Sequence, residues 1–249
     1  MKGVVLAGGT GSRLYPLTRV TNKHLLPVGR YPMIYHPLLR LRRAGVTDIG
    51  LVTSPEHMGD VVNLLGSGSR LGVDLTYRVQ DEPGGIAQAL GLCESFVGGE
   101  PFVVVLGDNV LGEDLTDEVA AFKAQAAQHG GARVLLKEVH DPERYGVPEF
   151  EEERIIRVIE KPADPPSSYS VIGIYFYDAT VFDFIRSLSP SQRGELEISD
   201  VSNEYAKQGT LSHGVLSSWW GDAGTFEGLE DANRLARDLI YEELPGVPD

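Results

Sequence analysis

The chain of 249 residues is 42% hydrophobic and carries a formal net charge of −14, from 36 acidic and 22 basic side chains. This acidic balance disfavours general binding to nucleic acid and docking on an anionic membrane surface. Its one cysteine cannot form an intrachain disulfide, and no apolar stretch is long enough for a signal peptide or a membrane span, so we expect a cytoplasmic protein.

Short apolar runs alternate with amphipathic stretches through the first half of the chain. The runs predict strands over 3–7, 48–54, 73–80 and 101–109, and the apolar spacing predicts helices over 33–44, 57–65, 85–97 and 116–129. This order predicts an α/β fold with a Rossmann-like, doubly wound, mostly parallel sheet covered by helices on both faces. In such sheets ligands bind beyond the carboxyl ends of the strands. The glycine-rich loop after Ala7 and the "GDN" of 107–109 lie at such ends.

The second half reads as a mixed sheet with fewer helices. Strands are predicted over 132–140, 147–150, 154–162 and 169–178, with a helix over 179–188. A loop within 194–209 leads into another helix, and a strand or turn within 217–224 precedes a terminal helix that starts near Thr225 and fades by Leu244. No segment has the composition of a linker between independent domains. We therefore expect one domain over 1–249, with its two halves meeting near residue 130.

A glycine-rich loop follows the first predicted strand. Gly8, Gly9 and Gly11 have no Cβ, so their backbone N–H groups can approach a polyanion closely. The loop lacks the Gly-Lys-Ser/Thr of a P-loop, and Leu14 stands where a dinucleotide fingerprint needs a glycine. By itself the pattern also fits a plain strand-to-helix turn. Two nearby cations favour an anionic ligand instead, since Arg13 can grip phosphate in a fork and Lys23 supplies a point charge.

Several motifs together resemble those of the sugar-1-phosphate nucleotidylyltransferases, and most of all the short glucose-1-phosphate thymidylyltransferases. The first are "LAGGTGSRLYPLT" (6–18) and "NKHLLPV" (22–28). Others recur in the expected order: "GRYPMIYHPL", "RVQDEPGGIAQAL", "VLGDN", "DPERYGV", "EKP", "GIYFYD", "RGELEISD" and "WWGDAGT". The resemblance covers essentially the whole chain. It implies a nucleotide-diphospho-sugar transferase fold, with a nucleotide-binding half at about 1–130 and a sugar-binding half with the terminal helix at about 131–249.

The resemblance implies that the first half binds dTTP. The expected nucleotide-binding residues are Leu6, Ala7, Gly8, Gly9, Gly11, Arg13, Gln80, Pro83 and Gly85. Gln80 and the Gly85 backbone would bind the pyrimidine edge, where a helix start also offers free N–H donors. Without the resemblance, "QDEPGGIAQAL" would be a helix N-terminus with a surface glutamine. The absence of any acid before Asp48 suits the same ligand, because an acid near the glycine loop would repel a triphosphate.

Two aspartates are candidate ligands of Mg²⁺. Asp108 follows the apolar run "FVVVL", and Asp222 lies within "WWGDAGT". Two carboxylates, phosphate oxygens and water form a suitable magnesium shell. The alternatives are a turn residue for Asp108 and a helix cap for Asp222. By resemblance both aspartates hold the metal, and they form the catalytic set together with Arg13 and Lys23.

The sugar phosphate is expected at "EKP" and "RGELE". Glu160 can accept hydrogen bonds from sugar hydroxyls, and Lys161 and Arg193 can bind the sugar phosphate. By resemblance the backbone of Gly146 and Val171 contacts glucose, with Tyr175 nearby. Taken alone, Glu160 and Lys161 would be an exposed charge pair. We interpret the three acids that follow Arg193 as helix N-terminal residues: Glu195, Glu197 and Asp200.

The remaining polar residues have simpler interpretations. Arg40, Arg42 and Arg43 are expected on a solvated helix face, Cys93 in the core, and "DPERYG" in a turn. The six histidines show no metal-ligand spacing.

The expected reaction joins dTTP and α-D-glucose 1-phosphate to give dTDP-glucose and pyrophosphate. A phosphate monoester with a second pKa near ~6 is already largely a dianion, so no general base is needed. The rivals are the same chemistry with UTP, since one methyl group separates thymine from uracil, and a non-catalytic domain that binds sugar nucleotides. The family suggests a homodimer or homotetramer and a place in dTDP-rhamnose synthesis. Longer members continue into helices that build a second, inhibitory site; here "PGVPD" cannot extend a helix, so weak end-product inhibition is expected.

Overall fold

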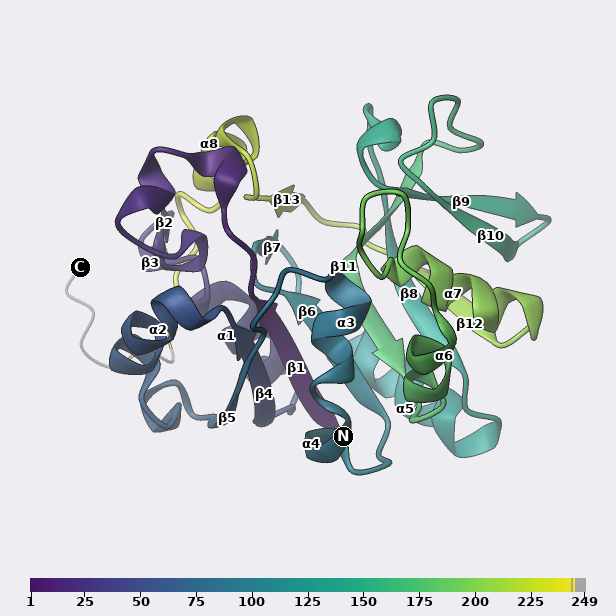
Figure 1. The fold of residues 1–249 in the computed structure, drawn as a ribbon, viewed down its shortest axis with the longest axis horizontal. Helices are drawn as coiled ribbons and strands as arrows, with labels where there is room; N and C mark the ends of the chain where they lie inside the picture. The colour runs from purple at the N-terminus through teal and green to yellow at the C-terminus, as the bar shows by residue number, and fades with distance from the viewer. Residues whose placement is uncertain (243, 245–249) are drawn as a thin grey trace.

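The computed structural model describes residues 1–242 and 244, arranged as helical layers around a twisted central sheet (Figure 1). Within these residues the main sheet has nine strands, and its longest path runs β10-β9-β11-β6-β1-β4-β5. β8 pairs with β11, and β12 pairs with β8. Two short sheets, β13-β7 and β2-β3, complete the fold. The α/β class and the mostly parallel sheet of the first half are confirmed.

The first half builds the parallel part of the sheet. β1 (Lys2–Ala7) lies between β4 (Asp48–Thr53) and β6 (Phe102–Leu106), and β4 is followed by β5 (Asp74–Val79). The crossover helices are α1 (Tyr35–Arg43), α2 (Met58–Leu65), α3 (Ile86–Gly91) and α4 (Glu94–Val97). The short strands are β2 (Pro27–Val28), β3 (Tyr31–Pro32) and β7 (Asn109–Leu111), and α5 (Thr116–Gln128) ends this half.

The second half adds antiparallel strands to β6. β11 (Tyr169–Tyr177) pairs antiparallel with both β6 and β8 (Ala132–Glu138), and β12 (Leu211–Val215) lies parallel to β8. β9 (Gly146–Glu151) and β10 (Arg154–Glu160) form a hairpin that branches from β11 at Val171. The remaining elements are α6 (Val181–Ser187), α7 (Ile198–Lys207), β13 (Trp220–Asp222) and α8 (Phe226–Leu235).

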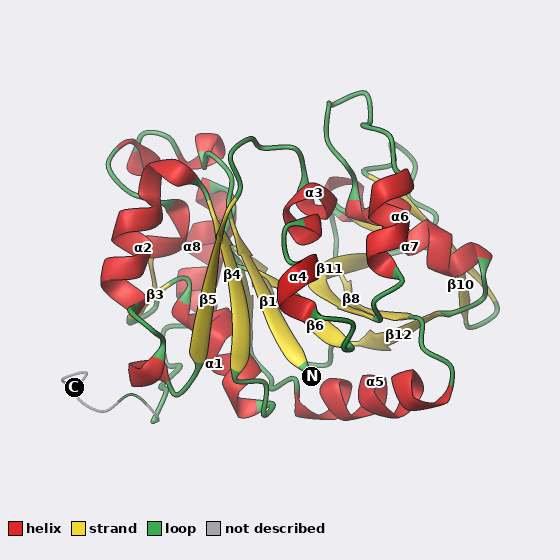
Figure 2. Ribbon diagram, turned by 60° about the horizontal axis from the view of Figure 1, so that its bottom comes forward, coloured by secondary structure: helices red, strands yellow, loops and turns green. Residues whose placement is uncertain are grey.

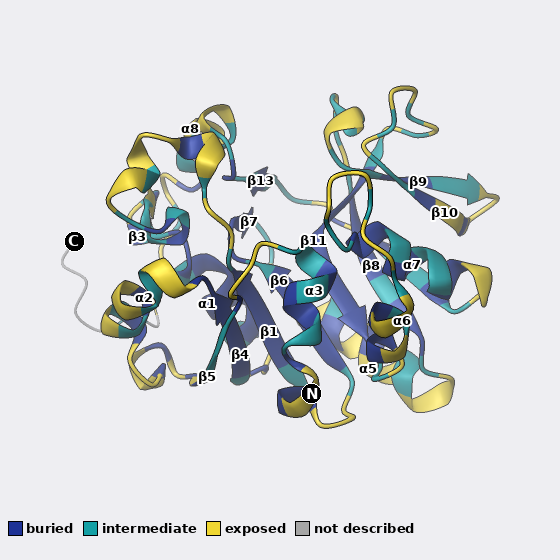
Figure 3. Cartoon of the chain, in the orientation of Figure 1, coloured by how far each residue is buried: buried dark blue, intermediate teal, exposed yellow. Residues whose placement is uncertain are grey.

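Two apolar cores lie on opposite faces of the sheet because successive strand residues point to opposite sides. Val5 and Ala7 of β1 belong to the core beneath α1, α2 and α5, whereas Val4 and Leu6 belong to the core beneath α3, α4, α6 and α7. Figure 2 shows the two helical layers, and Figure 3 shows that the central strands between them, such as β1 and β4, are buried. A third, smaller core under α8 includes Val28, Met33 and Ala232. No described helix is long and apolar enough to cross a membrane.

Two predicted helix boundaries were wrong. The helix expected over 85–97 is interrupted after Gly91, where Cys93 N–H donates to Leu90 O in a tighter turn; glycine weakens a helix at this point. The terminal helix ends at Leu235, because the chain turns to bury Tyr241 against α1. "PGVPD" lies outside the described residues.

Arg40 corrects the prediction of a solvated face on α1. Its side chain is buried and donates to Asp114 Oδ1 at 2.6 Å and to Leu111 O at 2.7 Å. Both partners follow β6 and are more than seventy residues away in sequence, so helical spacing could not reveal them. Cys93 is buried in the core as expected.

Candidate active site

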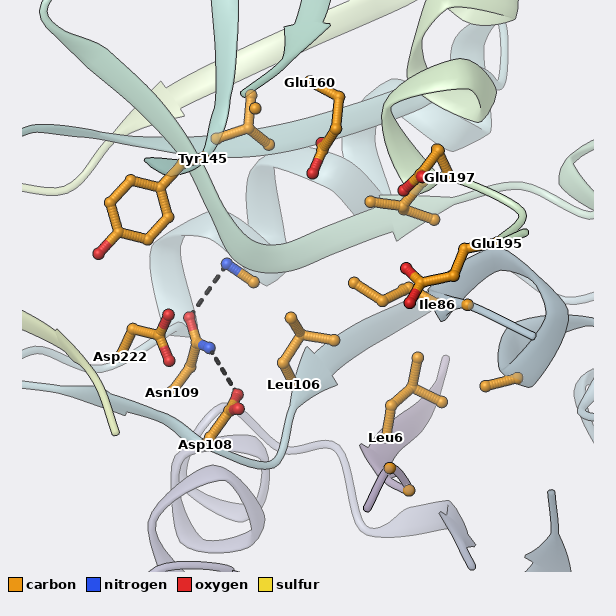
Figure 4. A pocket seen from close by; sticks show the side chains of 18 of the residues that line it. Leu6, Ile86, Leu106, Asp108, Asn109, Tyr145, Glu160, Glu195, Glu197 and Asp222 are labelled. Atoms are coloured by element: carbon orange, nitrogen blue, oxygen red, sulfur yellow. Dashed lines mark hydrogen bonds between the residues drawn. The ribbon is translucent and has the colours of Figure 1, made fainter. Parts of the chain in front are cut away.

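A cavity of about 500 Å³ lies between the two halves of the fold, at the carboxyl ends of β1, β5 and β6 (Figure 4). Most of the site residues predicted from the sequence line it: Leu6, Gly8, Gly9, Arg13, Lys23, Gln80, Pro83, Gly85, Asp108, Gly146, Glu160, Lys161, Val171, Tyr175, Arg193 and Asp222. The topology therefore brings segments from both halves of the chain into one concave space. Pockets at the carboxyl ends of parallel strands are the usual ligand sites of such sheets.

Ala7 and Gly11, two of the predicted nucleotide-binding residues, do not line the cavity, and their contacts with the nucleotide stay predictions. Ala7 is fully buried in the core on the α1 side of the sheet, because alternation along β1 turns it away from the site. Gly11 has φ 62°, and its carbonyl accepts from Leu14 N–H and from Thr18 Oγ1. A Cβ on Gly11 would lie 2.8 Å from Thr18 Cγ2, so glycine here shapes the loop that carries Arg13.

One end of the cavity gathers two acids and two cations. Lys23 Nζ lies 2.5 Å from Asp108 Oδ2, and both side chains are largely buried. Asp222 Oδ1, Asp108 Oδ2 and an Arg13 guanidinium nitrogen lie 2.9, 3.2 and 3.3 Å from the point where a Cβ on Gly224 would stand. The missing Cβ leaves room for these groups to converge. Asp222 is not the helix cap, because Thr225 Oγ1 accepts from Gly228 N–H at the start of α8.

The two aspartates differ in their proton affinity. Burial works to raise the pKa of Asp108, but the Lys23 ammonium, His24 and the hydrogen bonds from Lys23 and Asn109 together outweigh it and hold that pKa well below its usual range. Burial and the nearby negative charge of Asp108 raise the pKa of Asp222. Burial also lowers the pKa of the neighbouring His24 to about 3, with the charge of Lys23 acting in the same direction, so this imidazole is neutral. The site thus keeps Asp108 ionised and adds no positive charge from His24.

Asn109 connects Asp108 with three strands around the cavity. Its Nδ2 donates to Asp108 Oδ1 at 3.1 Å, and its Oδ1 accepts from Gly173 N–H at 3.0 Å and from Trp220 Nε1 at 2.7 Å. Gly173 lies where the pairing of β11 with β8 shifts register, which frees its N–H for a side chain. Figure 4 shows Asn109 between Asp108 and Asp222. The buried amide therefore holds the β6–β7 turn against β11 and β13.

The opposite end of the cavity contains Arg193 and three carboxylates. Arg193 donates to Glu197 through Nε at 3.1 Å and through NH2 at 2.7 Å, and it lies within 4 Å of Glu160 and Glu195. Lys161 Nζ is 3.9 Å from Glu160 Oε1. Burial raises the pKa of Glu160, and the Lys161 charge opposes this rise. Figure 4 shows Glu160, Glu195 and Glu197 on this side, across from the aspartates.

Several cavity residues were missed by the sequence analysis. Glu195 and Glu197 line the cavity, so their interpretation as helix-end acids alone is corrected; Glu197 does precede α7, but its carboxylate binds Arg193. The "DPERYG" segment forms a turn and also brings Arg144 and Tyr145 to the cavity, where the Tyr145 ring meets Trp220 edge-on. Asn109 and Trp220 lie within two residues of the predicted metal ligands Asp108 and Asp222 in the sequence. This closeness is the signal that could have identified them as site residues.

Comparison with known proteins identifies the family of this chain. The family model described as nucleotidyl transferase matches residues 2–238. A glucose-1-phosphate thymidylyltransferase of Neisseria meningitidis serogroup A is 46% identical over 236 residues, which cover 93% of this chain and 81% of the relative.

Two solved structures share the fold over nearly the whole chain. A Bacillus anthracis chain described as a glucose-1-phosphate thymidylyltransferase, crystallised with sucrose, is 58% identical over 97% of both chains, with a TM-score of 0.92. A UDP-glucose pyrophosphorylase in complex with UDP-glucose is 25% identical, over 94% of this chain and 97% of that one, with a TM-score of 0.80. The chain therefore belongs to the nucleotidyl transferase family, within the group of the glucose-1-phosphate thymidylyltransferases.

Proposed function

We propose that the chain condenses dTTP with α-D-glucose 1-phosphate, giving dTDP-glucose and pyrophosphate. The observation that carries the proposal is a single cavity with two different ends. Arg13, Lys23, Asp108 and Asp222 line one end, and Glu160, Lys161 and Arg193 line the other. The first set suits a triphosphate and the second suits a phosphorylated sugar.

The reaction proceeds by in-line attack of a sugar phosphate oxygen on the α-phosphorus, and pyrophosphate leaves from the opposite side. Lys161 and Arg193 hold the incoming phosphate, and Arg13 and Lys23 neutralise the departing one. Glu160 accepts hydrogen bonds from sugar hydroxyls. Because the attacking group is already an anion near neutral pH, these residues act by positioning and charge neutralisation rather than by removing a proton.

The donor set fits a divalent cation. Asp108 and Asp222 place carboxylate oxygens close together in the space where a Cβ on Gly224 would stand. The described residues contain no group of three or more side chains that could hold a metal ion. Two carboxylates would leave the other positions to phosphate oxygens and water, as is usual for Mg²⁺. When bound, Mg²⁺ would neutralise negative charge on the triphosphate. Release of Asp108 from Lys23 would accompany binding, since the two groups are paired at 2.5 Å.

Competition kinetics test this proposal. Pyrophosphate release with glucose 1-phosphate is measured for dTTP, UTP and dUTP, alone and in pairs. We expect turnover with dTTP, and a preference over UTP limited to about 10- to 200-fold if the methyl group alone distinguishes the bases. The second candidate is uridylyl transfer, favoured by the structural likeness to the UDP-glucose complex; a preference for UTP would establish it. Absence of turnover with every nucleotide would leave a non-catalytic sugar-nucleotide-binding protein.

The same site bears on the partners and location of the protein. Its ligands are small anions, and we propose no nucleic-acid or membrane partner for this acidic chain. We propose a cytoplasmic homodimer or homotetramer on the basis of the family resemblance; light scattering at several protein concentrations would determine the assembly.

A further inference from the structure

Gln80 lies at the end of the cavity beyond β5, and only part of its amide is free. Its side chain is buried, and its Nε2 donates to Gln88 Oε1 at 2.6 Å. The same Nε2 is 3.4 Å from Gly85 O. Gly85 directly precedes α3, and Gln88 lies in the first turn of this helix. The start of α3 therefore holds the Gln80 side chain in place.

The Gly85 carbonyl fixes the polarity of this arrangement. A backbone carbonyl can only accept a hydrogen bond, so the end of the Gln80 amide that faces it must be the NH₂ group. The Gln80 carbonyl oxygen then points the other way, toward Gly8; a Cβ on Gly8 would lie 2.5 Å from it. Gly8 and Gln80 both line the cavity, whereas Gln88 does not. The Gln80 carbonyl oxygen therefore presents a hydrogen-bond acceptor to the cavity.

We propose that Gln88 is a positioning residue that sets the base specificity of the enzyme by fixing the orientation of the Gln80 amide. This inference rests on the proposed function, in which Gln80 binds the pyrimidine edge. The ring N3 of thymine or uracil carries a hydrogen and can donate to the Gln80 oxygen. The ring N3 of cytosine carries a lone pair, which would face that oxygen and repel it. The fixed amide thus selects an imide base and rejects cytosine, and it does not distinguish thymine from uracil.

The physical reason for a second glutamine is the symmetry of the side-chain amide. A free glutamine can rotate its amide by 180° with little change in shape, which exchanges donor and acceptor. At 3.4 Å the contact with Gly85 is long for a hydrogen bond, whereas the contact with Gln88 is short. The Gly85 carbonyl therefore defines which end of the Gln80 amide is the NH₂ group, and the short bond to Gln88 Oε1 strengthens that orientation. When the wrong substrate leaves a buried polar group of the site unpaired, kcat/KM for that substrate can fall by several orders of magnitude.

Two substitutions at one position separate the chemistry from the packing. Gln88→Glu keeps an acceptor for Gln80 Nε2, because a carboxylate only accepts. Gln88→Met keeps the length of the side chain and removes the acceptor. The measurement is kcat/KM for dTTP and for dCTP with glucose 1-phosphate, together with the KM for glucose 1-phosphate and the thermal midpoint of each variant.

We expect Gln88→Met to reduce the ratio of kcat/KM for dTTP over dCTP by roughly tenfold or more, with an unchanged KM for glucose 1-phosphate. Gln88→Glu should keep a ratio close to that of the wild type. The proposal is overturned if Gln88→Met keeps the wild-type ratio, or if Gln88→Glu loses the ratio as fully as Gln88→Met. It is also overturned if Gln88→Met weakens both nucleotides and the sugar phosphate equally, since that result indicates a general structural role.

Binding measurements separate this inference from the proposed function. Dissociation constants of dTTP and dCTP are measured by calorimetry for the same three proteins, without glucose 1-phosphate. If the wild type binds dTTP but catalyses no transfer, the proposed reaction is wrong, and the ratio of the two dissociation constants still decides the role of Gln88. A smaller ratio in Gln88→Met alone supports the inference, and equal ratios in all three proteins refute it.

Discussion

Lys23 Nζ lies 2.5 Å from Asp108 Oδ2, although 85 residues separate the two in the chain. The sequence predicts separate roles for them, Lys23 on phosphate and Asp108 on metal. In the folded chain they form a buried ion pair, and breaking such a pair by removing one partner is costly. The pair therefore holds the segment that carries Lys23 against the end of β6.

Asp108→Asn should lower kcat by about 100-fold or more at saturating Mg²⁺, because a neutral amide is a poor magnesium ligand and no longer balances Lys23. Steady-state kinetics over a range of Mg²⁺ concentrations measures the effect. Asp114→Asn is the matched control, since it also removes an ion pair with a buried cation, Arg40, but lies outside the cavity. Near-wild-type turnover in Asp108→Asn would show that this aspartate is not part of the catalytic set.

Lys161→Ala should raise the KM for glucose 1-phosphate by roughly tenfold and change the KM for dTTP far less, since the lost charge lies at the Glu160 end of the cavity. Both constants and kcat are measured. Lys207→Ala, which removes an exposed ion pair with Glu204, is the control and should change neither. An effect confined to dTTP would move Lys161 to the nucleotide end.

Asn109→Ala should lower the free energy of unfolding by about 2–4 kcal/mol, because Gly173 N–H and Trp220 Nε1 lose a buried acceptor. It should also lower kcat, since Asp108 loses its amide partner. Urea unfolding and kinetics at low temperature measure the two effects separately. Asn233→Ala, which removes bonds to Gly29 N–H and Leu229 O outside the cavity, should lower stability without lowering kcat. A wild-type kcat in Asn109→Ala would mean that Asn109 serves stability alone.

His36 should make the protein less stable as the pH falls. Burial, with a smaller contribution from Arg40, lowers the pKa of His36 to about 4. Its Nε2 lies 3.0 Å from the Val28 carbonyl and its Nδ1 lies 2.9 Å from the Tyr241 hydroxyl, so the neutral ring donates to the first and accepts from the second. Between pH 6.5 and 4 the unfolded chain binds the extra proton, and the stability lost over this window is about 3 kcal/mol.

Urea unfolding at intervals between pH 7 and 4 tests this expectation. His36→Gln removes one of the two buried histidines with a lowered pKa and should make the dependence on pH less steep, the remaining slope coming in part from His24, although it lowers stability near pH 7. His129→Gln, at an exposed histidine, should keep the wild-type slope. If His36→Gln loses stability on acidification as steeply as the wild type, other groups account for the acid sensitivity.

The sequence by itself determined the layered α/β architecture and many of the residues that face the cavity. The unbroken apolar run Val4, Val5, Leu6 and Ala7 already indicates a strand buried on both faces, because successive side chains of a strand point to opposite sides. Parallel strands that all point the same way place their following loops at one edge. The strand directions therefore assign the glycine loop and Asp108 to a common site, and the family resemblance adds Gln80 to it.

Only the tertiary structure decided the partners of these residues. The pairing of Lys23 with Asp108, the fork between Arg193 and Glu197, and the burial of Arg40 by Leu111 and Asp114 all depend on how separate elements meet. The orientation of the Gln80 amide also depends on the tertiary structure. The residue type alone leaves open whether its NH₂ group or its oxygen faces a base. A side chain's type is local and can be read from the chain, but the polarity it presents is set by neighbours that folding brings within hydrogen-bond distance.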